Sequence, residues 1–194
     1  MELQHICVFC GSNFGDDELY RETARHVGQT LAARDIGLVY GGGNRGLMGE
    51  VARTMKEAGA HIIGVSPKRF HRPESVPFTV DEYIIVDTMH QRKATMYSKA
   101  DAFIALPGGI GTLEELAEIT TWRQIGFTNK PTALLNIHGF YNPLLDLLES
   151  MYRHGFTRED QWKQLIVSDS IEEILDIFTN YTYEKALWEN WTNV

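Results

Sequence analysis

Short apolar runs alternate with amphipathic stretches along nearly the whole chain, and this alternation predicts the order of strands and helices. The apolar runs are bounded by glycine or proline and lie at His5–Cys10, Gly37–Tyr40, His61–Val65, Tyr83–Val86, Asp101–Leu106, Thr132–Leu135 and Gln164–Val167. The helical period fills the intervals at Asp17–Arg34, Leu47–Ala58, Met89–Lys99, Thr112–Gly126, Asn142–His154 and Ser170–Thr179. Most runs lack the polar alternation of a half-exposed strand, as expected when helices cover both faces of a parallel sheet. The pattern therefore predicts an α/β fold with a doubly wound, Rossmann-like parallel sheet of about seven strands.

No linker, internal repeat or low-complexity segment interrupts this pattern, so residues 1–194 are expected to form one domain. The long irregular stretch Ser66–Phe78 holds three of the six prolines and several basic residues, and it is expected to be a surface loop. In doubly wound sheets, ligands bind at the carboxyl ends of the strands, near the point where the strand order reverses. The turns that follow the strands are therefore where candidate chemistry is expected.

Charge narrows the class of partner. The chain has 18 Lys and Arg residues against 26 Asp and Glu residues, a net charge of −8, and no run of basic residues. We therefore expect neither nucleic-acid binding nor attachment to an anionic membrane, and no segment reaches the ~18 apolar residues of a membrane span. The first residues lack the features of a signal peptide, which makes the cytoplasm the expected location. An anionic ligand must then be held by donors close to it.

Metal and redox chemistry are not expected. Cys7 and Cys10, the two cysteines of the chain, are spaced as C-x-x-C within a buried apolar run. Residues three apart on a strand point to opposite faces, so neither a metal nor a disulfide bridges this pair easily. The seven histidines are scattered and form no H-x-x-x-H pair. We expect no metal ion and no cofactor.

Three of the predicted strand-to-helix turns are rich in glycine, at Cys10–Ser12, Gly41–Gly46 and Pro107–Thr112. Glycine lets backbone N–H groups approach an anion closely, and the N-terminus of the following helix adds a partial positive charge. A single turn of this kind is common for conformational reasons alone. Three such turns on one sheet favour a phosphorylated small molecule as the ligand.

The spacing Gly41-x-Gly43-x-x-Gly46 matches the dinucleotide-binding fingerprint. The acidic residue expected about 20 positions later is missing, because the next apolar run continues into Lys68 and Arg69. This basic pair could accept a 2′-phosphate, which leaves a reductase as an alternative. A P-loop is excluded, because no turn continues into Gly-Lys-Ser or Gly-Lys-Thr.

A helical segment carries cations between methionines. Met89, Arg92, Lys93 and Met96 share one face at helical spacing. A wholly apolar face would indicate core, whereas this mixed face indicates cations held partly buried beside an anionic partner.

Acidic residues follow the third glycine-rich turn. Thr112 is expected to cap the helix there, which would place Glu114 and Glu115 in its first turn and Glu118 one turn later. Complementing the helix dipole accounts for one such glutamate. It does not account for an acid that follows a phosphate-binding turn and repels the same anion, so a chemical role is indicated.

Together these motifs resemble the LOG ("lonely guy") family of cytokinin riboside 5′-monophosphate phosphoribohydrolases, whose members are often labelled possible lysine decarboxylases. The resemblance rests on Gly41–Gly43 with Gly46–Gly49, on Met89-x-x-Arg92-Lys93, and on Pro107-Gly108-Gly109-x-Gly111-Thr112-x-x-Glu115. It implies a homodimer that cleaves the N-glycosidic bond of a nucleoside 5′-monophosphate, AMP or its N6-prenylated form. By motif position, it implies that Arg92 and Glu115 are the catalytic pair.

The physical reading of these residues agrees with that reaction. A carboxylate at Glu115 would stabilise an oxocarbenium-like sugar and orient water. The guanidinium of Arg92 would serve the ribose, the phosphate or the base, and the sequence does not choose among them. The phosphate is expected on the backbone amides of the third turn, with a hydroxyl from Thr112. The residues expected to contact substrate are Gly11, Ser12, Gly43, Met89, Lys93, Gly108, Gly109, Gly111 and Thr112.

Two other function classes are weighed against the hydrolase. A pyridoxal-phosphate decarboxylase needs a Schiff-base lysine, and Lys93, the one lysine within a motif, has Arg92 beside it, which argues against that class. A non-catalytic nucleotide-binding or signalling module would keep the glycines but would need neither Arg92 nor Glu115. Release of free adenine from AMP separates this alternative from the hydrolase.

Overall fold

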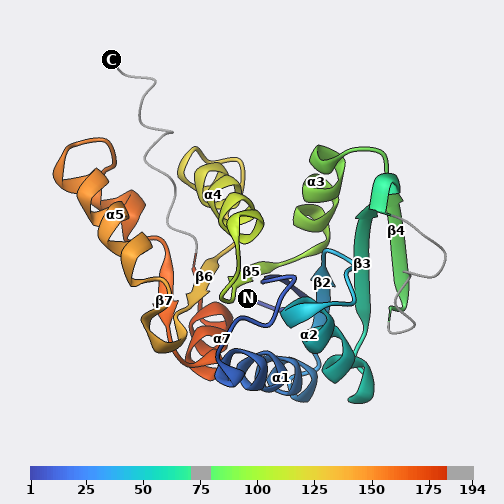
Figure 1. The fold of residues 1–194 in the computed structure, drawn as a ribbon. Helices are drawn as coiled ribbons and strands as arrows, with labels where there is room; N and C mark the ends of the chain where they lie inside the picture. Colours follow the sequence, from blue (N-terminus) through green and yellow to red (C-terminus); the bar gives the residue numbers. More distant parts are fainter. Residues whose placement is uncertain (71–79, 183–194) are drawn as a thin grey trace.

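The computed structural model describes residues 1–70 and 80–182, and its central feature is the predicted parallel sheet (Figure 1). Every strand pair in the sheet is parallel, and the order is β4-β3-β2-β1-β5-β6-β7. The strands are β1 (His5–Phe9), β2 (Gly37–Tyr40), β3 (Ile62–Pro67), β4 (Glu82–Val86), β5 (Ala102–Ala105), β6 (Thr132–Leu135) and β7 (Ile166–Ser168). The α/β class and the doubly wound architecture are confirmed.

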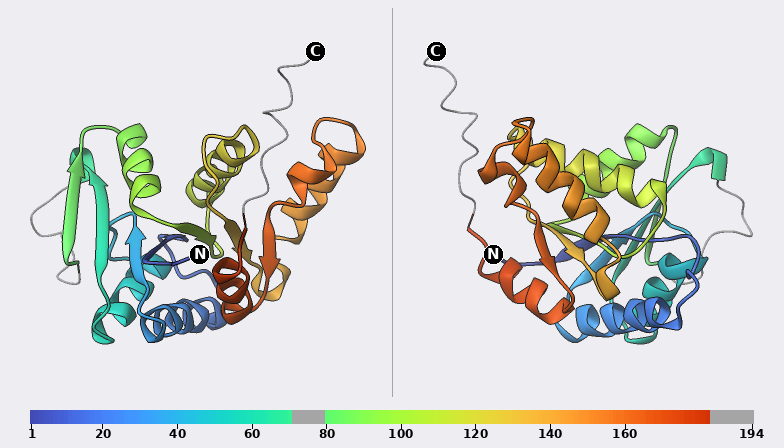
Figure 2. Two further views of the ribbon diagram at one scale, coloured as in Figure 1. Left: turned by 180° about the vertical axis from the view of Figure 1, so that it is seen from behind. Right: turned by 60° about the vertical axis from the view of Figure 1, so that its left-hand side comes forward.

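Helices cover the two faces of the sheet in two groups (Figures 1 and 2). The helices α1 (Glu18–Ala33), α2 (Gly46–Glu57) and α7 (Ile171–Thr179) pack on one face, where residues such as Leu31, Met55 and Phe178 are fully buried. The helices α3 (Met89–Lys99), α4 (Ile110–Gln124) and α5 (Asn142–Arg153) lie over the other face. The core is therefore divided into two apolar clusters by the sheet itself.

The order of the strands reverses between β1 and β5. Ile6 of β1 pairs with Leu38 of β2 on one side and with Ala102 of β5 on the other. From β1 the chain continues into α1 on one face, and from β5 it continues into α4 on the opposite face. The N–H of Gly11 donates to the carbonyl of Pro107 over 3.1 Å, which joins the two turns at this switch point. The first and third glycine-rich turns therefore lie side by side.

One predicted boundary, the start of α4, is wrong in a way that affects the site. Helix α4 begins at Ile110 with Gly109 as its N-cap, so Thr112 lies inside the helix and does not cap it. Glu114 and Glu115 consequently lie beyond the first turn, which contains no acidic residue. The extended backbone of Gly109 lets the helix start earlier than the side-chain preference for threonine suggests.

The other differences from the prediction lie away from this turn. Ser66 and Pro67 end β3 and are not loop, and Lys68–Phe70 form a 3-10 helix; the rest of the predicted loop, up to 78, lies outside the described residues. A 3-10 turn at Ile137–Gly139 and the short helix α6 (Glu159–Trp162) are additional elements. Within the described ranges, no helix is long and apolar enough to cross a membrane.

The two cysteines lie on opposite faces of β1 and its extension, as predicted. Cys7 belongs to the apolar cluster under α3 and α4, and Cys10 belongs to the cluster over α1 and α2. Both thiols are free and buried. The C-x-x-C spacing therefore reflects the alternation of a buried strand.

Candidate active site

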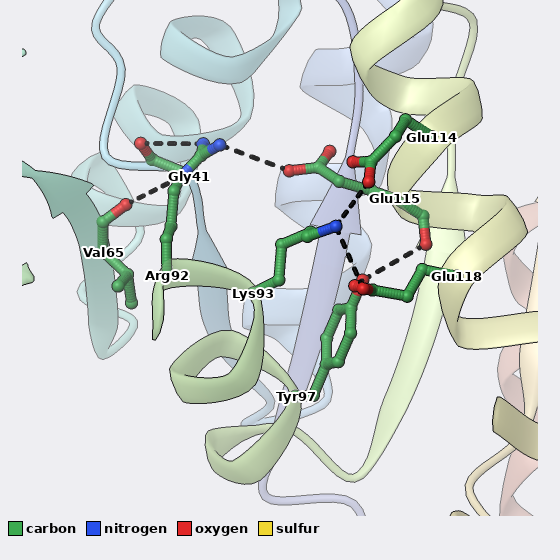
Figure 3. A network of polar contacts seen from close by, with 8 residues as sticks. All are labelled: Gly41, Val65, Arg92, Lys93, Tyr97, Glu114, Glu115 and Glu118. Atoms are coloured by element: carbon green, nitrogen blue, oxygen red, sulfur yellow. Dashed lines mark hydrogen bonds and ion pairs between the residues drawn. The ribbon is translucent and has the colours of Figure 1, made fainter. Parts of the chain in front are cut away.

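Arg92 is held in place by the ends of two strands. It lies in the first turn of α3, where Thr88 caps the helix. Its Nε donates to the carbonyl of Val65 at the end of β3 over 3.1 Å, and its Nη2 donates to the carbonyl of Gly41, just after β2, over 3.2 Å (Figure 3). Two backbone acceptors thus orient the guanidinium before any ligand binds, which preorganises it for electrostatic work.

Glu115 faces Arg92 from the neighbouring helix. Its Oε1 lies 3.4 Å from Nη1 of Arg92, and only 12% of its side chain is exposed. Burial raises the pKa of Glu115, and the guanidinium of Arg92 opposes this rise only in part. A buried carboxylate with a raised pKa is a stronger base than an exposed one, as expected of a group that orients or deprotonates water. The structure therefore brings the predicted pair together.

Lys93 points between the same helices but binds carboxylates there. Its Nζ contacts Glu114 and lies 3.0 Å from Oε1 of Glu118, and its side chain is 7% exposed (Figure 3). The hydroxyl of Tyr97 donates to Oε2 of Glu118 over 2.9 Å. The cation that was expected to contact substrate is therefore already occupied by two carboxylates.

This pairing does not fit the Schiff-base lysine of a pyridoxal-phosphate enzyme. Burial lowers the pKa of Lys93, but its hydrogen bonds with Glu114 and Glu118 raise that pKa overall. A lysine that forms a Schiff base must lose its proton readily, which requires a lowered pKa. The surroundings of Lys93 favour the ammonium ion instead.

The third glycine-rich turn presents backbone donors without a side-chain cap. In the described part of the chain, no side chain accepts a hydrogen bond at the N-terminus of α4. A β-carbon at Gly109 or Gly111 would meet no atom within 4 Å, so these two positions border open space. Thr112 is buried beneath Gly108, with its hydroxyl facing that glycine. Gly109 and Gly111 are therefore the open, exposed part of the predicted phosphate-binding turn.

A cavity of about 240 Å³ lies beside this turn. Gly11, Ser12, Gly108 and Gly109 line it, so residues of the first and third turns meet at this cavity. Three aromatic side chains, those of Phe14, Tyr20 and Phe140, also line it. The sequence did not identify these three residues as site residues. Phe14 follows Ser12 closely enough to be suspected, whereas Phe140 comes from beyond β6 and carries no local signal.

The second glycine-rich turn packs closely against the first. Gly46 has φ +59°, and a β-carbon there would approach the carbonyl carbon of Ser12 to 2.3 Å. Its glycine is therefore required by chain packing rather than by a ligand. Gly43 lies in the same turn with Met48 close to it, and Met89 is partly exposed at the start of α3. Among the described residues, no group of three His, Cys, Asp or Glu side chains could hold a metal ion.

Comparison with solved structures shows the same fold. The molybdenum cofactor binding protein from the phototrophic bacterium Rippkaea orientalis superposes with a TM-score of 0.70 at 23% identity, over 93% of this chain and 98% of its own. The molybdenum cofactor carrier protein MCP from Chlamydomonas reinhardtii gives a TM-score of 0.69 at 21% identity, over 92% and 98% of the two chains. At these identities the likeness shows the fold alone.

Comparison of sequences shows the family. Residues 48–178 match the family model described as "Possible lysine decarboxylase". The probable cytokinin riboside 5′-monophosphate phosphoribohydrolase LOGL2 of Oryza sativa subsp. japonica is 43% identical over 96% of this chain and 79% of its own. The cytokinin riboside 5′-monophosphate phosphoribohydrolase LOG2 of Arabidopsis thaliana is 40% identical over 98% and 92% of the two chains. With the family model and these relatives over most of its length, the chain belongs to the LOG family of phosphoribohydrolases.

Proposed function

We propose that the protein hydrolyses the N-glycosidic bond of a nucleoside 5′-monophosphate, AMP or its N6-prenylated form, and releases the free base and ribose 5-phosphate. The observation that carries the proposal is the pairing of buried Glu115 with Arg92, which two strand carbonyls hold beside it. The family relatives supply the substrate class.

Glu115 is the group proposed to act at the sugar. Cleavage of the C1′–N bond leaves its electron pair on the base and builds an oxocarbenium-like charge on the ribose, which a nearby carboxylate stabilises. Water then bonds to C1′ and gives up a proton to this carboxylate. The departing base takes up one proton from solvent, and the carboxyl group returns its proton to solvent, so that one water is consumed in all. The raised pKa of Glu115, caused by its burial, makes it a better acceptor of that proton.

The phosphate is proposed to bind at the N-terminus of α4. The N–H groups from Gly109 to Thr112 and the positive end of the helix dipole provide donors there, and Gly11 and Ser12 approach from the first turn. Arg92 stays available to the ribose, the phosphate or the base. Met89, partly exposed at the start of α3, is proposed to pack against the base.

We also propose that the protein acts as a cytoplasmic homodimer. Three apolar residues of the last part of α4 and its end are candidates for the partner surface, Ile119, Trp122 and Ile125, but Ile119 is completely buried in the core. Trp122 and Ile125 remain partly exposed, and Phe127, 77% exposed, lies next to them. Together with the hollow that Tyr97, Trp122 and Phe127 line, these side chains support a partner surface at the end of α4.

Incubation with a panel of nucleoside mono-, di- and triphosphates, followed by chromatography of the free base, tests the proposal. We expect free base from monophosphates and far less from the other nucleotides. Binding of AMP without release of adenine would instead identify the non-catalytic nucleotide-binding module.

A further inference from the structure

Helices α3 and α4, which carry the two halves of the candidate catalytic pair, are joined by a cluster of polar side chains. Their ribbons stand apart over the sheet (Figure 1), and long side chains span the interval between them (Figure 3). Lys93 and Tyr97 extend from α3, one helical turn apart. Glu114 and Glu118 extend from α4, also one turn apart, on either side of Glu115 along the chain.

Glu118 makes the central contacts in this cluster. One of its oxygens lies 3.0 Å from the ammonium of Lys93, and the other accepts the hydroxyl of Tyr97 over 2.9 Å. That hydroxyl also lies 3.3 Å from the backbone carbonyl of Glu115. Tyr97 therefore contacts both the backbone of the candidate catalytic glutamate and the side chain of Glu118.

We propose that Glu118, acting through Lys93 and Tyr97, is a positioning residue that holds Glu115 opposite Arg92. Arg92 and Lys93 are neighbours in the first half of α3, so whatever anchors Lys93 to α4 also sets the distance of Arg92 from that helix. The proposal rests on the proposed hydrolase function, because it concerns the pair that would perform the reaction.

Burial makes these contacts effective. Taken as whole residues, Lys93 and Tyr97 are each only 5% exposed, and the side chain of Glu118 is 24% exposed. Charge pairs shielded from water are screened less and hold a more defined geometry than exposed pairs. Reacting groups displaced by about 1 Å can lose on the order of a hundredfold in rate. These largely buried contacts therefore control the Arg92–Glu115 distance.

The same cluster influences the protonation of Glu115. The charges that act on it are those of Arg92 and Lys93 of α3 and of Glu114 and Glu118 of α4. Tyr97, Cys7 and Cys10 are the other titratable groups near it, and its charge raises the pKa of each of them. Burial is the main cause of the raised pKa of Glu115, and the negative charges of Glu114 and Glu118 raise it further. Removal of the charge of Glu118 should therefore lower the pKa of Glu115.

The test uses Glu118→Gln and Tyr97→Phe, two substitutions that keep the size of the side chain. The control is Glu82→Gln, which removes the partner of Lys99, 3.1 Å away at the other end of α3. Base release from AMP gives kcat and KM for each variant, thermal melting gives the folded fraction, and carbon NMR of labelled glutamate gives the pKa of Glu115 without any need for turnover.

We expect Glu118→Gln to lower kcat about tenfold or more, to change KM little and to lower the pKa of Glu115. As a single substitution, Tyr97→Phe should lower kcat. In the double variant with Glu118→Gln it should lower kcat little further, because both substitutions act on one cluster. Glu82→Gln should behave as the wild type. An unchanged kcat, a rise in KM alone, or a loss explained by unfolding would overturn the proposal. Should the wild type release no base at all, the hydrolase function fails, and an unchanged Arg92–Glu115 separation in a crystal structure of Glu118→Gln would then overturn the positioning role independently.

Discussion

A β-carbon added to Gly41 would lie 1.8 Å from Nη2 of Arg92. The same glycine offers its carbonyl to that nitrogen over 3.2 Å. The glycine just after β2 thus makes room for a side chain 51 residues later in the chain. The guanidinium can occupy its place beside Glu115 only because position 41 has no side chain.

Substitution Gly41→Ala should therefore displace Arg92 and reduce base release by on the order of a hundredfold. The check is a double-mutant cycle with Arg92→Ala. Because the alanine acts through the guanidinium, it should cost little further activity once Arg92 is gone. Equal losses in the two backgrounds would show that Gly41 acts on the site in some other way.

Substitution Glu115→Gln should nearly abolish base release while AMP still binds. The amide keeps the shape of the side chain but loses the charge proposed to stabilise the oxocarbenium-like sugar, and such a loss typically costs on the order of 10²–10³ in rate. Single-turnover release of adenine and calorimetric binding of AMP measure the two effects separately. Wild-type activity in this variant would remove Glu115 from the mechanism.

The same substitution should stabilise the folded protein at neutral pH. Burial raises the pKa of Glu115, so the folded state binds more protons than the unfolded state between the two pKa values, and stability falls as pH rises through that interval. Glutamine does not ionise, so the variant does not lose stability in this way as pH rises. The melting temperature of Glu115→Gln should therefore exceed that of the wild type by more at pH 7.5 than at pH 5, at about 2–4 °C for each kcal/mol.

Glu50 should affect the pH dependence of folding stability in the opposite direction. Burial alone would raise its pKa, but the arginines Arg25, Arg21 and Arg53 around it lower that pKa overall. Its charge therefore contributes stability above the unfolded-state pKa, and this contribution is lost as pH falls through the lowered folded-state value. Glu50→Gln should cost about 1–2 kcal/mol near neutral pH, since the arginines stay partly solvated, and less in acid. Thermal melts across pH check both predictions. As pH rises, the melting temperature of Glu115→Gln should rise relative to the wild type, and that of Glu50→Gln should fall relative to it.

Ligand recognition should depend on a phosphate monoester. AMP, with Glu115→Gln to prevent turnover, and ribose 5-phosphate should raise the melting temperature, because a ligand at a hundred times its Kd stabilises by roughly 2.7 kcal/mol. Adenosine lacks the anionic anchor, and NAD replaces the monoester with a diester and adds bulk. Strong stabilisation by NAD or NADP without any by AMP would favour the reductase alternative.

The proposed dimer should have twice the 22.1 kDa mass of one chain in light scattering at micromolar concentration. Phe127→Asp should shift this mass towards the monomer, because it places a charge in the proposed partner surface. Phe156→Asp is the matched control, since Phe156 is 85% exposed but lies beyond α5. A monomeric wild type would contradict the dimer outright.

The hydrophobic pattern was sufficient to predict the sheet, because strands such as β2 and β6 are buried on both faces and leave a continuous apolar run. It could not locate the start of α4. By local preference a threonine side chain would cap the helix, yet Gly109 is the N-cap. The preceding residue, Gly108, packs against Gly11 of the first glycine-rich turn. Local preference is overridden here by a contact between segments distant in the chain.

The candidate site was predicted in part for the same reason. The spacing of Arg92 and Lys93 correctly indicated buried cations, but helical periodicity says nothing about which element lies opposite. The partners of Lys93 in the structure are glutamates of α4, brought there by the sheet order. The aromatic wall at Phe140 likewise depends on β6 lying next to β5, which no local motif encodes.

Cys7 and Cys10 also give the molecule two internal reporters of its own opening. Both thiols are buried, burial raises the pKa of each, and only the thiolate reacts with alkylating reagents. Labelling must then wait for the strand at the centre of the sheet to be uncovered. Because the two sulfurs belong to different cores, their separate labelling rates compare how often each half of the protein opens. Equal rates would mean that both halves open in one cooperative event.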